Sequence, residues 1–557
     1  MEEAILICYL VVLLGLGVFA RRRAARTGED YFVASRTLSP ILLFLTMAAT
    51  NFSALTVFGF SGSGWRFGYA FYPVIAFGTG FMAVMFLIIG RPVWRLGREH
   101  GWVTPPEMIM ARWRNPWLRG LFLAVMVAFT LPYLAMQPMA AGYALEGLVG
   151  IPYFAGAALM TAVMLLYTYF GGLRGVAWTD ALQGGILIVS LTAALVCIAQ
   201  AQGGITQANQ TVLQAFPEMF SRPGREGVYT PGIWLGFLFL WLWADPMFPQ
   251  LFQRFYAARS ERGIRTTAAL YPILTGFLFL LPVSIGVIGR LAFPELPEGA
   301  GSDQILPLLL DAYAPRWISA LVLTAALAAL MSTLDSQLLS LSSMITRDLF
   351  RPALASRGKP VGERAQFWTG KLTVVILAVA GLAIAWRPPA SFLSVATQAF
   401  TGLAVLLPTV IAALYSRRAT ASGCIASIVV GEGLVVATYF GVLPDLGTLP
   451  VVPIVLVSGL VLVAFSWFTR RSAEGAPAVR GIPVHIRRRS LVWIAPAGVV
   501  FFLANDFWAW GDSRIGWLGY PLWMWRAIAL CLVTAVLFAV LPGGESPAQR
   551  STGDGER

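Results

Sequence analysis

The fold is decided by residues 316–350, which read RWISALVLTAALAALMSTLDSQLLSLSSMITRDLF. This stretch is long and apolar enough to cross a bilayer as one helix, yet its middle carries a carboxylate and several hydroxyls. Helical spacing places four residues on one face and an aspartate at its edge: Ala329, Ser332, Thr333, Ser336 and Asp335. An aspartate at the bilayer centre costs about 2.5–3.5 kcal/mol on insertion scales, so it is normally retained where it faces a cavity, an ion or a partner.

The oxygen atoms of this face suit a hard cation. Hydroxyl and carboxylate oxygens favour Na⁺ or a proton over a transition metal. The alternative is that the hydroxyls only bond to the preceding helical turn and let neighbouring helices pack closely. Asp335 makes that alternative harder to hold for the whole face.

The composition indicates an all-α protein with many membrane-spanning helices. The chain has 557 residues, of which 57% are hydrophobic and 12% charged, and a mean hydropathy of +0.72, whereas about a quarter of the residues in soluble domains are charged. The net charge of +13 comes from arginines between apolar runs, where they act as topology signals, so we expect no nucleic-acid partner. The four cysteines are scattered through apolar runs and indicate neither a disulfide framework nor a zinc site.

Apolar runs of 17–25 residues predict about fifteen membrane helices. Basic clusters recur on one side of the alternation, which places that side in the cytoplasm, the N-terminus outside and the C-terminus inside a cell inner (plasma) membrane. The predicted organisation is a flanking helix with a basic loop (1–37), a first inverted repeat (38–200), an extracellular loop (201–232), a second inverted repeat (233–416), C-terminal flanking helices (417–541) and a disordered tail (542–557).

Two of the predicted spans contain helix breakers. The run 38–64 carries Asn51, Ser53 and several glycines, and the run 233–256 carries Pro246 and Pro249. Proline removes a backbone hydrogen bond, so the second helix is expected to kink or unwind. Each interruption lies in the first helix of one half, and such paired interruptions are typical of the central site of a transporter.

The chain resembles the sodium:solute symporter family over roughly residues 1–470. The motifs that carry the resemblance are DYFVASR (30–36), NFSALTVFGFSGSG (51–64), YTYFGGLRGVAWTDALQ (167–183), PQLFQRFYAAR (249–259), AALMSTLDSQLLSLSSMITRDLF (328–350) and QAFTG (398–402). The resemblance implies a five-plus-five inverted repeat of the LeuT-like kind with flanking helices. It also implies Na⁺ as the coupling ion, a small organic solute as cargo and transport by alternating access.

The resemblance also implies binding residues. One Na⁺ would be held by the carbonyls of Ala49, Phe52 and Ala329 and the side chains of Ser332 and Thr333. A second cation, Na⁺ or H⁺, would lie among Asp180, Ser332, Asp335 and Ser336. The chain departs from two-sodium relatives in carrying Asp335 instead of serine, and this carboxylate could instead pair with a neighbouring hydroxyl. Asp180 could equally be a helix-terminal residue near the cytoplasm.

The resemblance to the family also implies which residues form the solute pocket, namely Asn51, Ser53, Leu55, Trp241, Ala244, Asp245 and Gln398. Asp245 invites a cationic or amino-bearing solute, but it could equally cap the half-helix that Pro246 breaks. Gln253 and Arg254 are expected only to anchor and pack their helix. The last two helices resemble a small accessory subunit fused to the chain, and a separate accessory subunit or self-association is a further expectation.

These observations predict a sodium-coupled symporter that imports a small organic solute, and not an enzyme. The runs contain no Ser/His/Asp set, Walker loop or cluster of metal ligands. The alternatives are a proton-coupled symporter of the same fold, or a membrane sensor or channel without coupled transport.

Overall fold

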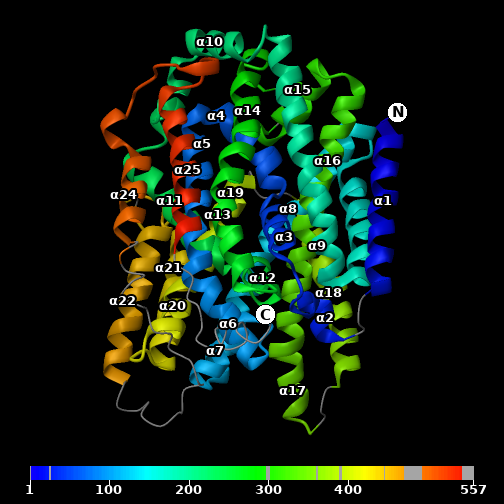
Figure 1. The fold of residues 1–557 in the computed structure, drawn as a ribbon, viewed down its shortest axis with the longest axis vertical. Helices are drawn as coiled ribbons and strands as arrows, with labels where there is room; N and C mark the ends of the chain where they lie inside the picture. Colours follow the sequence, from blue (N-terminus) through cyan, green and yellow to red (C-terminus); the bar gives the residue numbers. More distant parts are fainter. Residues whose placement is uncertain are drawn as a thin grey trace, which may run out of the picture.

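A computed structural model describes residues 2–23, 27–296, 301–358, 362–387, 392–444, 446–469, 492 and 494–541. In these ranges the chain forms a bundle of helices that run along one common direction, without a β-sheet (Figure 1). The apolar composition explains this choice, because a helix satisfies its own backbone hydrogen bonds where lipid offers no partner. The predicted tail 542–557 lies outside the described residues.

The first part of the chain contains the helices α1 to α10. Their bounds are α1 Glu2–Arg23, α2 Gly28–Val33, α3 Pro40–Asn51, α4 Phe60–Phe67, α5 Phe71–Met82, α6 Arg91–His100, α7 Pro105–Trp113, α8 Pro116–Val149, α9 Tyr153–Ala201 and α10 Ile205–Ala215.

The second half continues the bundle. Its helices are α11 Pro231–Ala244, α12 Pro249–Ala257, α13 Glu261–Leu278, α14 Leu280–Ala292, α15 Ile305–Tyr313, α16 Arg316–Met344, α17 Arg351–Ala355, α18 Glu363–Ala385, α19 Phe392–Ala404 and α20 Leu407–Tyr415. The C-terminal flanking helices are α21 Ala421–Tyr439, α22 Val451–Thr469, α24 Ile494–Asn505 and α25 Leu522–Val540.

The number of spans differs from the fifteen expected. Within the described residues, ten helices are long and apolar enough to cross a membrane, or eleven if one bent pair counts as a span. Four of the expected runs contain apolar helices of only 10–17 residues: Ala4–Leu13, Pro40–Asn51, Tyr153–Leu166 and Ile494–Ala509. The runs 154–170 and 177–200 form two helical parts of α9, as expected, because the backbone bends sharply at Gly172, whose φ of 56° is not helical.

The two predicted interruptions are present. Helix α3 begins with the Ser39 side chain accepting a hydrogen bond from the Leu42 N–H, and it ends at Asn51. Residues 52 and 53 leave the helix before a π-helical turn at Leu55–Gly59 leads into α4. Helices α11 and α12 are separated by the turn Asp245–Met247 and meet at a bend of 53°. Prolines inside the second interruption account for its break.

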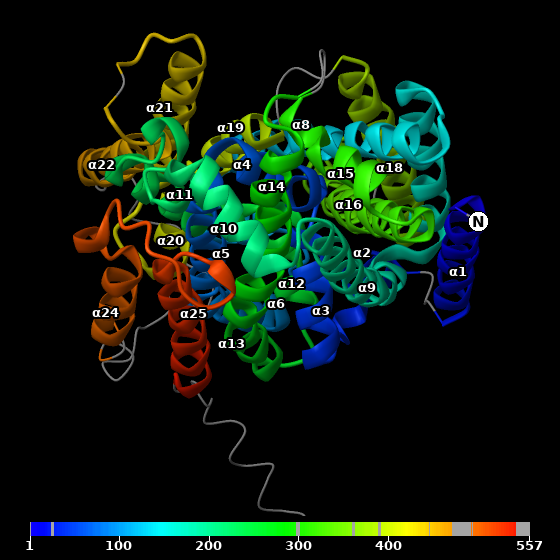
Figure 2. The same cartoon turned by 90° about the horizontal axis from the view of Figure 1, so that it is seen from above.

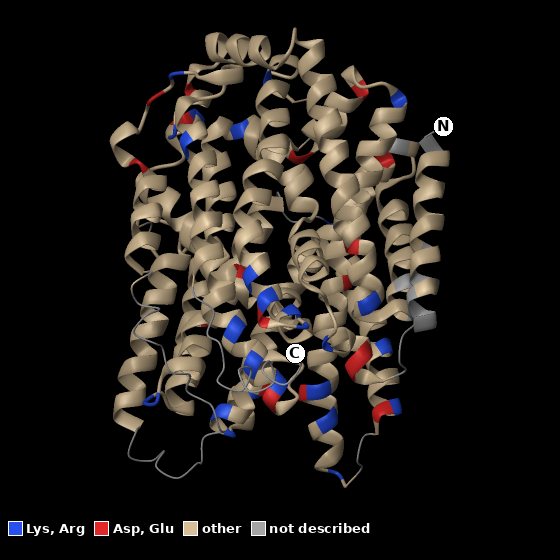
Figure 3. Cartoon of the chain, viewed as in Figure 1, with Lys and Arg blue, Asp and Glu red and all other residues tan. Residues whose placement is uncertain are grey.

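Charged side chains gather towards the two ends of the bundle. Most of the basic ones lie at the end that contains α2, α6, α7 and α17, and a largely uncharged middle separates them from the end covered by α10 and α15 (Figure 3). Helix α1 begins at the α10 end (Figure 1). This distribution matches the alternation of arginine clusters in the sequence.

The last two helices pack against the rest of the chain. Helix α25 lies beside α13 and α5, and α24 lies beside α25 (Figure 2). At the α10 end, Arg222 forms an ion pair with Asp506, whose other oxygen pairs with Arg526 at 2.5 Å. The Trp523 indole donates to the Phe220 carbonyl at 2.9 Å. Burial and the neighbouring Arg526 lower the pKa of Arg222 to about 10, so its charge persists at neutral pH.

Candidate cation and solute site

Backbone carbonyls from the first interruption converge on one hydroxyl of α16. Thr333 Oγ1 lies 3.0 Å from the Thr50 carbonyl oxygen, 3.1 Å from that of Phe52 and 3.3 Å from that of Ala329. One hydroxyl hydrogen reaches only one of these acceptors at a time, so the cluster is rich in oxygen lone pairs. Such a set of buried carbonyl and hydroxyl oxygens fits Na⁺.

The structure therefore brings together three of the five predicted sodium ligands, namely Phe52, Ala329 and Thr333. The Ala49 carbonyl lies on the same helix end, where the Phe52 N–H approaches it at 3.2 Å. Ser332 differs, because its hydroxyl donates to Asp180 Oδ1 at 2.5 Å. The Thr50 carbonyl was not among the predicted ligands, because the resemblance implied the carbonyls of Ala49 and Phe52 on either side of it.

The second predicted cation position contains a guanidinium group. Arg254 Nη2 lies 3.0 Å from Asp180 Oδ2 and 2.7 Å from Ser336 Oγ. Its Nε donates to Thr46 Oγ1 at 3.0 Å, and the Thr46 hydroxyl in turn donates to Asp180. The Asp180 and Arg254 side chains are 0% and 1% exposed, so this is a fully desolvated ion pair.

This arrangement changes two expectations from the sequence. Asp180 is not a helix-terminal residue at the surface, because it is buried within α9. Arg254 does more than anchor α12, since it joins α12 to α9 and α16. Asp335 is buried on the same stretch of α16 as Ser336. Sequence spacing alone could not place Arg254 here, because its partners lie 74 and 82 residues away.

A small cavity lies between the two interruptions. Its accessible volume is about 20 Å³, which is room for little more than a water molecule, so the cavity is contracted. Its lining combines aromatic rings with a few polar groups: Asn51, Leu55, Thr56, Phe60, Ile75, Thr79, Tyr133, Trp241, Asp245, Phe279 and Phe400.

Four of the predicted pocket residues line this cavity, namely Asn51, Leu55, Trp241 and Asp245. Two others are buried close by in the chain. Ser53 accepts a hydrogen bond from the Tyr133 hydroxyl at 2.9 Å, and Ala244 precedes Asp245 without lining the cavity.

Gln398 does not line the cavity, and the structure removes it from the predicted pocket. Its side chain is exposed on α19, whereas Phe400 lines the cavity from the same helix. Residues two positions apart in a helix point to nearly opposite sides, so a shift of two residues exchanges one face for the other.

Tyr133 and Tyr271 were missed by the sequence analysis. Tyr133 bonds to Ser53, and the Tyr271 hydroxyl accepts a hydrogen bond from Asn51 Nδ2 at 2.8 Å. Both tyrosines lie in apolar runs, α8 and α13, where an aromatic residue looks like ordinary core.

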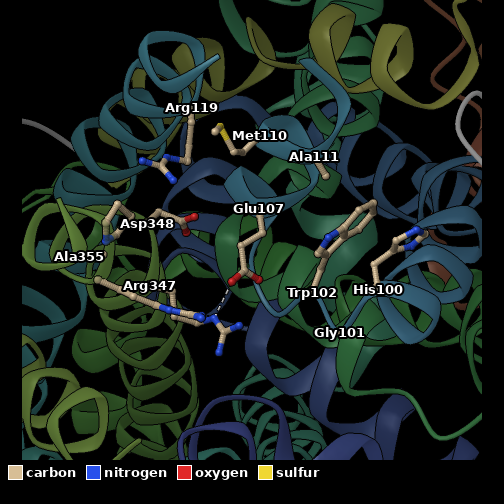
Figure 4. Close-up of a pocket in the computed structure, with 12 residues that line it drawn as sticks. His100, Gly101, Trp102, Glu107, Met110, Ala111, Arg119, Arg347, Asp348 and Ala355 are labelled. Atoms are coloured by element: carbon tan, nitrogen blue, oxygen red, sulfur yellow. Dashed lines mark hydrogen bonds and ion pairs between the residues drawn. The ribbon is translucent and has the colours of Figure 1, made fainter. Parts of the chain in front are cut away.

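A larger cavity of about 430 Å³ lies at the basic end of the bundle, between the end of α6, α7, the start of α8 and the segment 347–355 that follows α16 (Figure 4). Its carboxylates already have partners. Glu107 pairs with Arg347 at 2.7 Å, and Asp348 accepts a hydrogen bond from Thr104 at 2.7 Å. Glu107 also accepts hydrogen bonds from the N–H groups of Val103 and Thr104 and so completes the cap of α7. The Glu107–Arg347 ion pair and the Thr104–Asp348 hydrogen bond connect the start of α7 to the segment after α16. These contacts are separate from the helix interruptions.

Comparison with known proteins agrees with this geometry. The model of the sodium:solute symporter family matches residues 31–431. The sodium/pantothenate symporter of Escherichia coli (strain K12) is 28% identical over 473 residues, which cover 83% of this chain and 95% of that protein. The sodium/proline symporter of the same strain is 26% identical, with 83% and 92% covered.

A solved structure shares the fold. A Na⁺-coupled sialic acid symporter in a substrate-bound, outward-open state superposes with a TM-score of 0.71 at 21% identity, covering 86% of this chain and 99% of that one. Together with the paired helix interruptions, this establishes the five-plus-five inverted-repeat fold with flanking helices. The match of the family model to most of the chain shows that the protein belongs to the sodium:solute symporter family and is a sodium-coupled symporter of small solutes.

Proposed function

We propose that the protein moves one Na⁺ together with one small organic solute by alternating access. The Na⁺ is held by the oxygens of Thr50, Phe52, Ala329 and Thr333, and the solute is held in the central cavity. The single observation that carries this proposal is the convergence of the Thr50 and Phe52 carbonyls on the Thr333 hydroxyl, because carbonyls freed where a helix unwinds need a partner and a cation supplies one.

A fixed positive charge supports a single coupling ion. Arg254 already compensates Asp180 and bonds to Ser336, at the position where a second Na⁺ was predicted. A sodium ion there would have to displace the guanidinium from a buried ion pair, which is costly unless another anion receives it. We therefore assign this position to Arg254 in the transport cycle. In this proposal Asp335, which is buried on the same stretch of α16, holds no second ion.

The test is solute uptake by the purified protein in liposomes. Uptake should saturate, should require an inward Na⁺ gradient and should persist when the membrane potential is clamped at zero. An equal response to a proton gradient without Na⁺ would favour the proton-coupled alternative. Uptake that neither saturates nor couples to Na⁺ would favour a channel. Variant Thr333→Ala is the negative control for the cation site.

We also propose that the α10 end faces outside and the basic end faces the cytoplasm of the plasma membrane. Gln210 on α10 and Arg357 after α17 are exposed at opposite ends. In a Cys8→Ser background, a membrane-impermeant thiol reagent should label Gln210→Cys in intact cells and should label Arg357→Cys only after lysis. The reverse pattern would invert the topology.

A further inference from the structure

Asp245 is a buried carboxylate with little to balance it. It begins the turn between α11 and α12, and the residue is 1% exposed. Its Oδ1 has no hydrogen-bond partner among the described residues, and its Oδ2 has one long contact of 3.5 Å with Asn51 Nδ2. That amide donates more closely to Tyr271, at 2.8 Å. A buried carboxylate left in this condition costs several kcal/mol unless a partner arrives.

The carboxylate does not cap the broken helix. Helix α12 begins after Phe248, and no side chain bonds to the N–H groups of its first turn. The bond across the turn runs from the Phe248 N–H to the Asp245 backbone carbonyl, at 3.1 Å. Backbone geometry therefore makes the turn without the Asp245 side chain. Of the two roles left open by the sequence, helix capping is excluded.

Arg254, the nearest cation in sequence on the same broken helix, is already engaged. Its three nitrogens bond to Thr46, Gln250, Asp180 and Ser336. The counter-charge for Asp245 must therefore come from elsewhere. Asp245 lines the central cavity, which is contracted in this structure and must widen to admit a solute.

The cavity also offers unpaired donors. Trp241 Nε1 and Thr79 Oγ1 have no hydrogen-bond partner among the described residues, and both residues line the same cavity as Asp245. Aromatic rings of Tyr133 and Phe400 form part of the wall, and such faces favour a cationic group. The lining thus combines one anionic acceptor, two donors and aromatic surface.

We propose that the solute carries a protonated primary or secondary amine, which donates to Asp245, and a separate acceptor group, which receives hydrogen bonds from Trp241 and Thr79. This inference rests on the proposed function, because it names the class of solute for the same cavity. A small amino acid or amino alcohol meets the requirement. An anionic solute without an amine places its charge beside that of Asp245 and is disfavoured.

The test is thermal unfolding of the purified full-length protein in Na⁺ and in K⁺, with matched probes. The amines are L-proline and ethanolamine, and their amine-free counterparts are tetrahydrofuran-2-carboxylate and ethylene glycol. Pantothenate serves as a carboxylate without a basic amine. We expect at least one amine to stabilise the protein in Na⁺, and its counterpart to have no effect.

The variants then locate the interaction. Asp245→Asn should raise the half-saturating amine concentration roughly 100-fold, because it removes one partner of a buried charge pair, while stabilisation by Na⁺ alone is retained. Trp241→Phe keeps an aromatic ring but removes the indole N–H donor, and it should weaken binding of the same amine less than Asp245→Asn does. Glu432→Gln, which removes a half-buried carboxylate of α21, should change neither response.

The outcomes separate the two proposals. If no amine stabilises the wild-type protein, or if Asp245→Asn binds the amine normally, the assignment of Asp245 is overturned. Stabilisation by pantothenate in Na⁺ but by none of the amines overturns it while leaving sodium-coupled symport intact. Should Asp245→Asn not fold, the wild-type comparison of amines with their counterparts and the Trp241→Phe variant still decide the question. Failure of Na⁺ to affect binding of any probe would count against the proposed cation site instead.

Discussion

Thr333 and Ser332 are neighbours on α16, yet their hydroxyls contact different partners. Thr333 lies against the carbonyls of the first interruption, whereas Ser332 donates to Asp180. Thr333→Ala should therefore raise the half-saturating Na⁺ concentration about tenfold, which corresponds to about 1.4 kcal/mol. Ser332→Ala should raise it less. Sodium-dependent uptake at a fixed solute concentration measures both, and equal effects would contradict the separation of their roles.

Arg254 and Asp180 form the buried ion pair of the site, and each depends on the other. Arg254→Gln leaves Asp180 buried without its counter-charge and should lower the free energy of unfolding by about 3–5 kcal/mol. The double variant Asp180→Asn/Arg254→Gln should recover much of this loss, because neither charge then remains. A double-mutant cycle by denaturant unfolding measures the coupling. Additive effects would mean that the pair contributes no coupling energy.

At the residue scale, the sequence predicts side chains that belong to local motifs better than those that meet across the fold. Asp180 and Ser332 stand in motifs shared with the family, and the structure brings them into contact. Arg254 was misjudged because its role depends on packing between distant helices. Gln398 was misjudged because the sequence does not fix which face of α19 points inward.

The contact between α4 and α14 depends on two glycines. A Cβ on Gly286 would lie 2.0 Å from the Ser61 carbonyl oxygen, and one on Gly64 would lie 2.4 Å from that of Val283. Gly286→Ala should therefore separate the helices and lower the free energy of unfolding by about 1–3 kcal/mol. Gly185→Ala is the matched control, because nothing lies within 4 Å of its added Cβ. Equal stability of the two variants in thermal unfolding would show that α4 and α14 can move apart at little cost in free energy.

The segment before α15 packs against α4, the second half of the first broken helix. Asp303 Oδ2 accepts a hydrogen bond from the Phe392 N–H at 2.9 Å, and a Cβ on Gly62 of α4 would meet Asp303 at 2.8 Å. Burial raises the pKa of Asp303, while the Phe392 N–H and Arg66 act to lower it. Asp303→Ala should speed amide hydrogen exchange in Ile305–Tyr313 several-fold, because the bond to α19 is lost. Unchanged exchange would show that packing alone holds this segment.

At the element scale, the helix breakers in the sequence predicted the two interruptions, but the apolar runs did not predict the number of spans. Pro246 and Pro249 act locally, so their effect could be predicted from the sequence. The short lengths of helices such as Pro40–Asn51 and Tyr153–Leu166 could not be predicted, because the length of an apolar run does not show where the helix within it begins and ends.

For the whole molecule, one coupling ion sets a limit on accumulation. A tenfold Na⁺ gradient supplies about 1.4 kcal/mol and a potential of 100 mV about 2.3 kcal/mol, so one ion supports roughly 500-fold accumulation of a neutral solute. Reversal potentials in proteoliposomes should give one Na⁺ per solute for the wild-type protein and for Asp335→Ser. A ratio of two would restore the second cation position as a sodium site and would contradict the role assigned to Arg254.

The overall architecture could be predicted because composition, arginine alternation and paired interruptions all describe the chain as a whole. The position of the last two helices could not be predicted. They contact an earlier loop through Asp506 and Trp523, whose partners Arg222 and Phe220 lie 284 and 303 residues earlier in the chain.

The ion pair between Arg222 and Asp506 also has a consequence for biosynthesis. The ribosome completes Arg222 long before Asp506, and at roughly 5–20 residues per second the interval is on the order of 15–60 s. During that time the loop that contains Arg222 lacks the partners that Asn505 and Asp506 provide. The α10 end of the bundle therefore stays incomplete until the final helices are inserted, and nascent chains that stop before Asp506 should be degraded by quality-control proteases faster than complete ones.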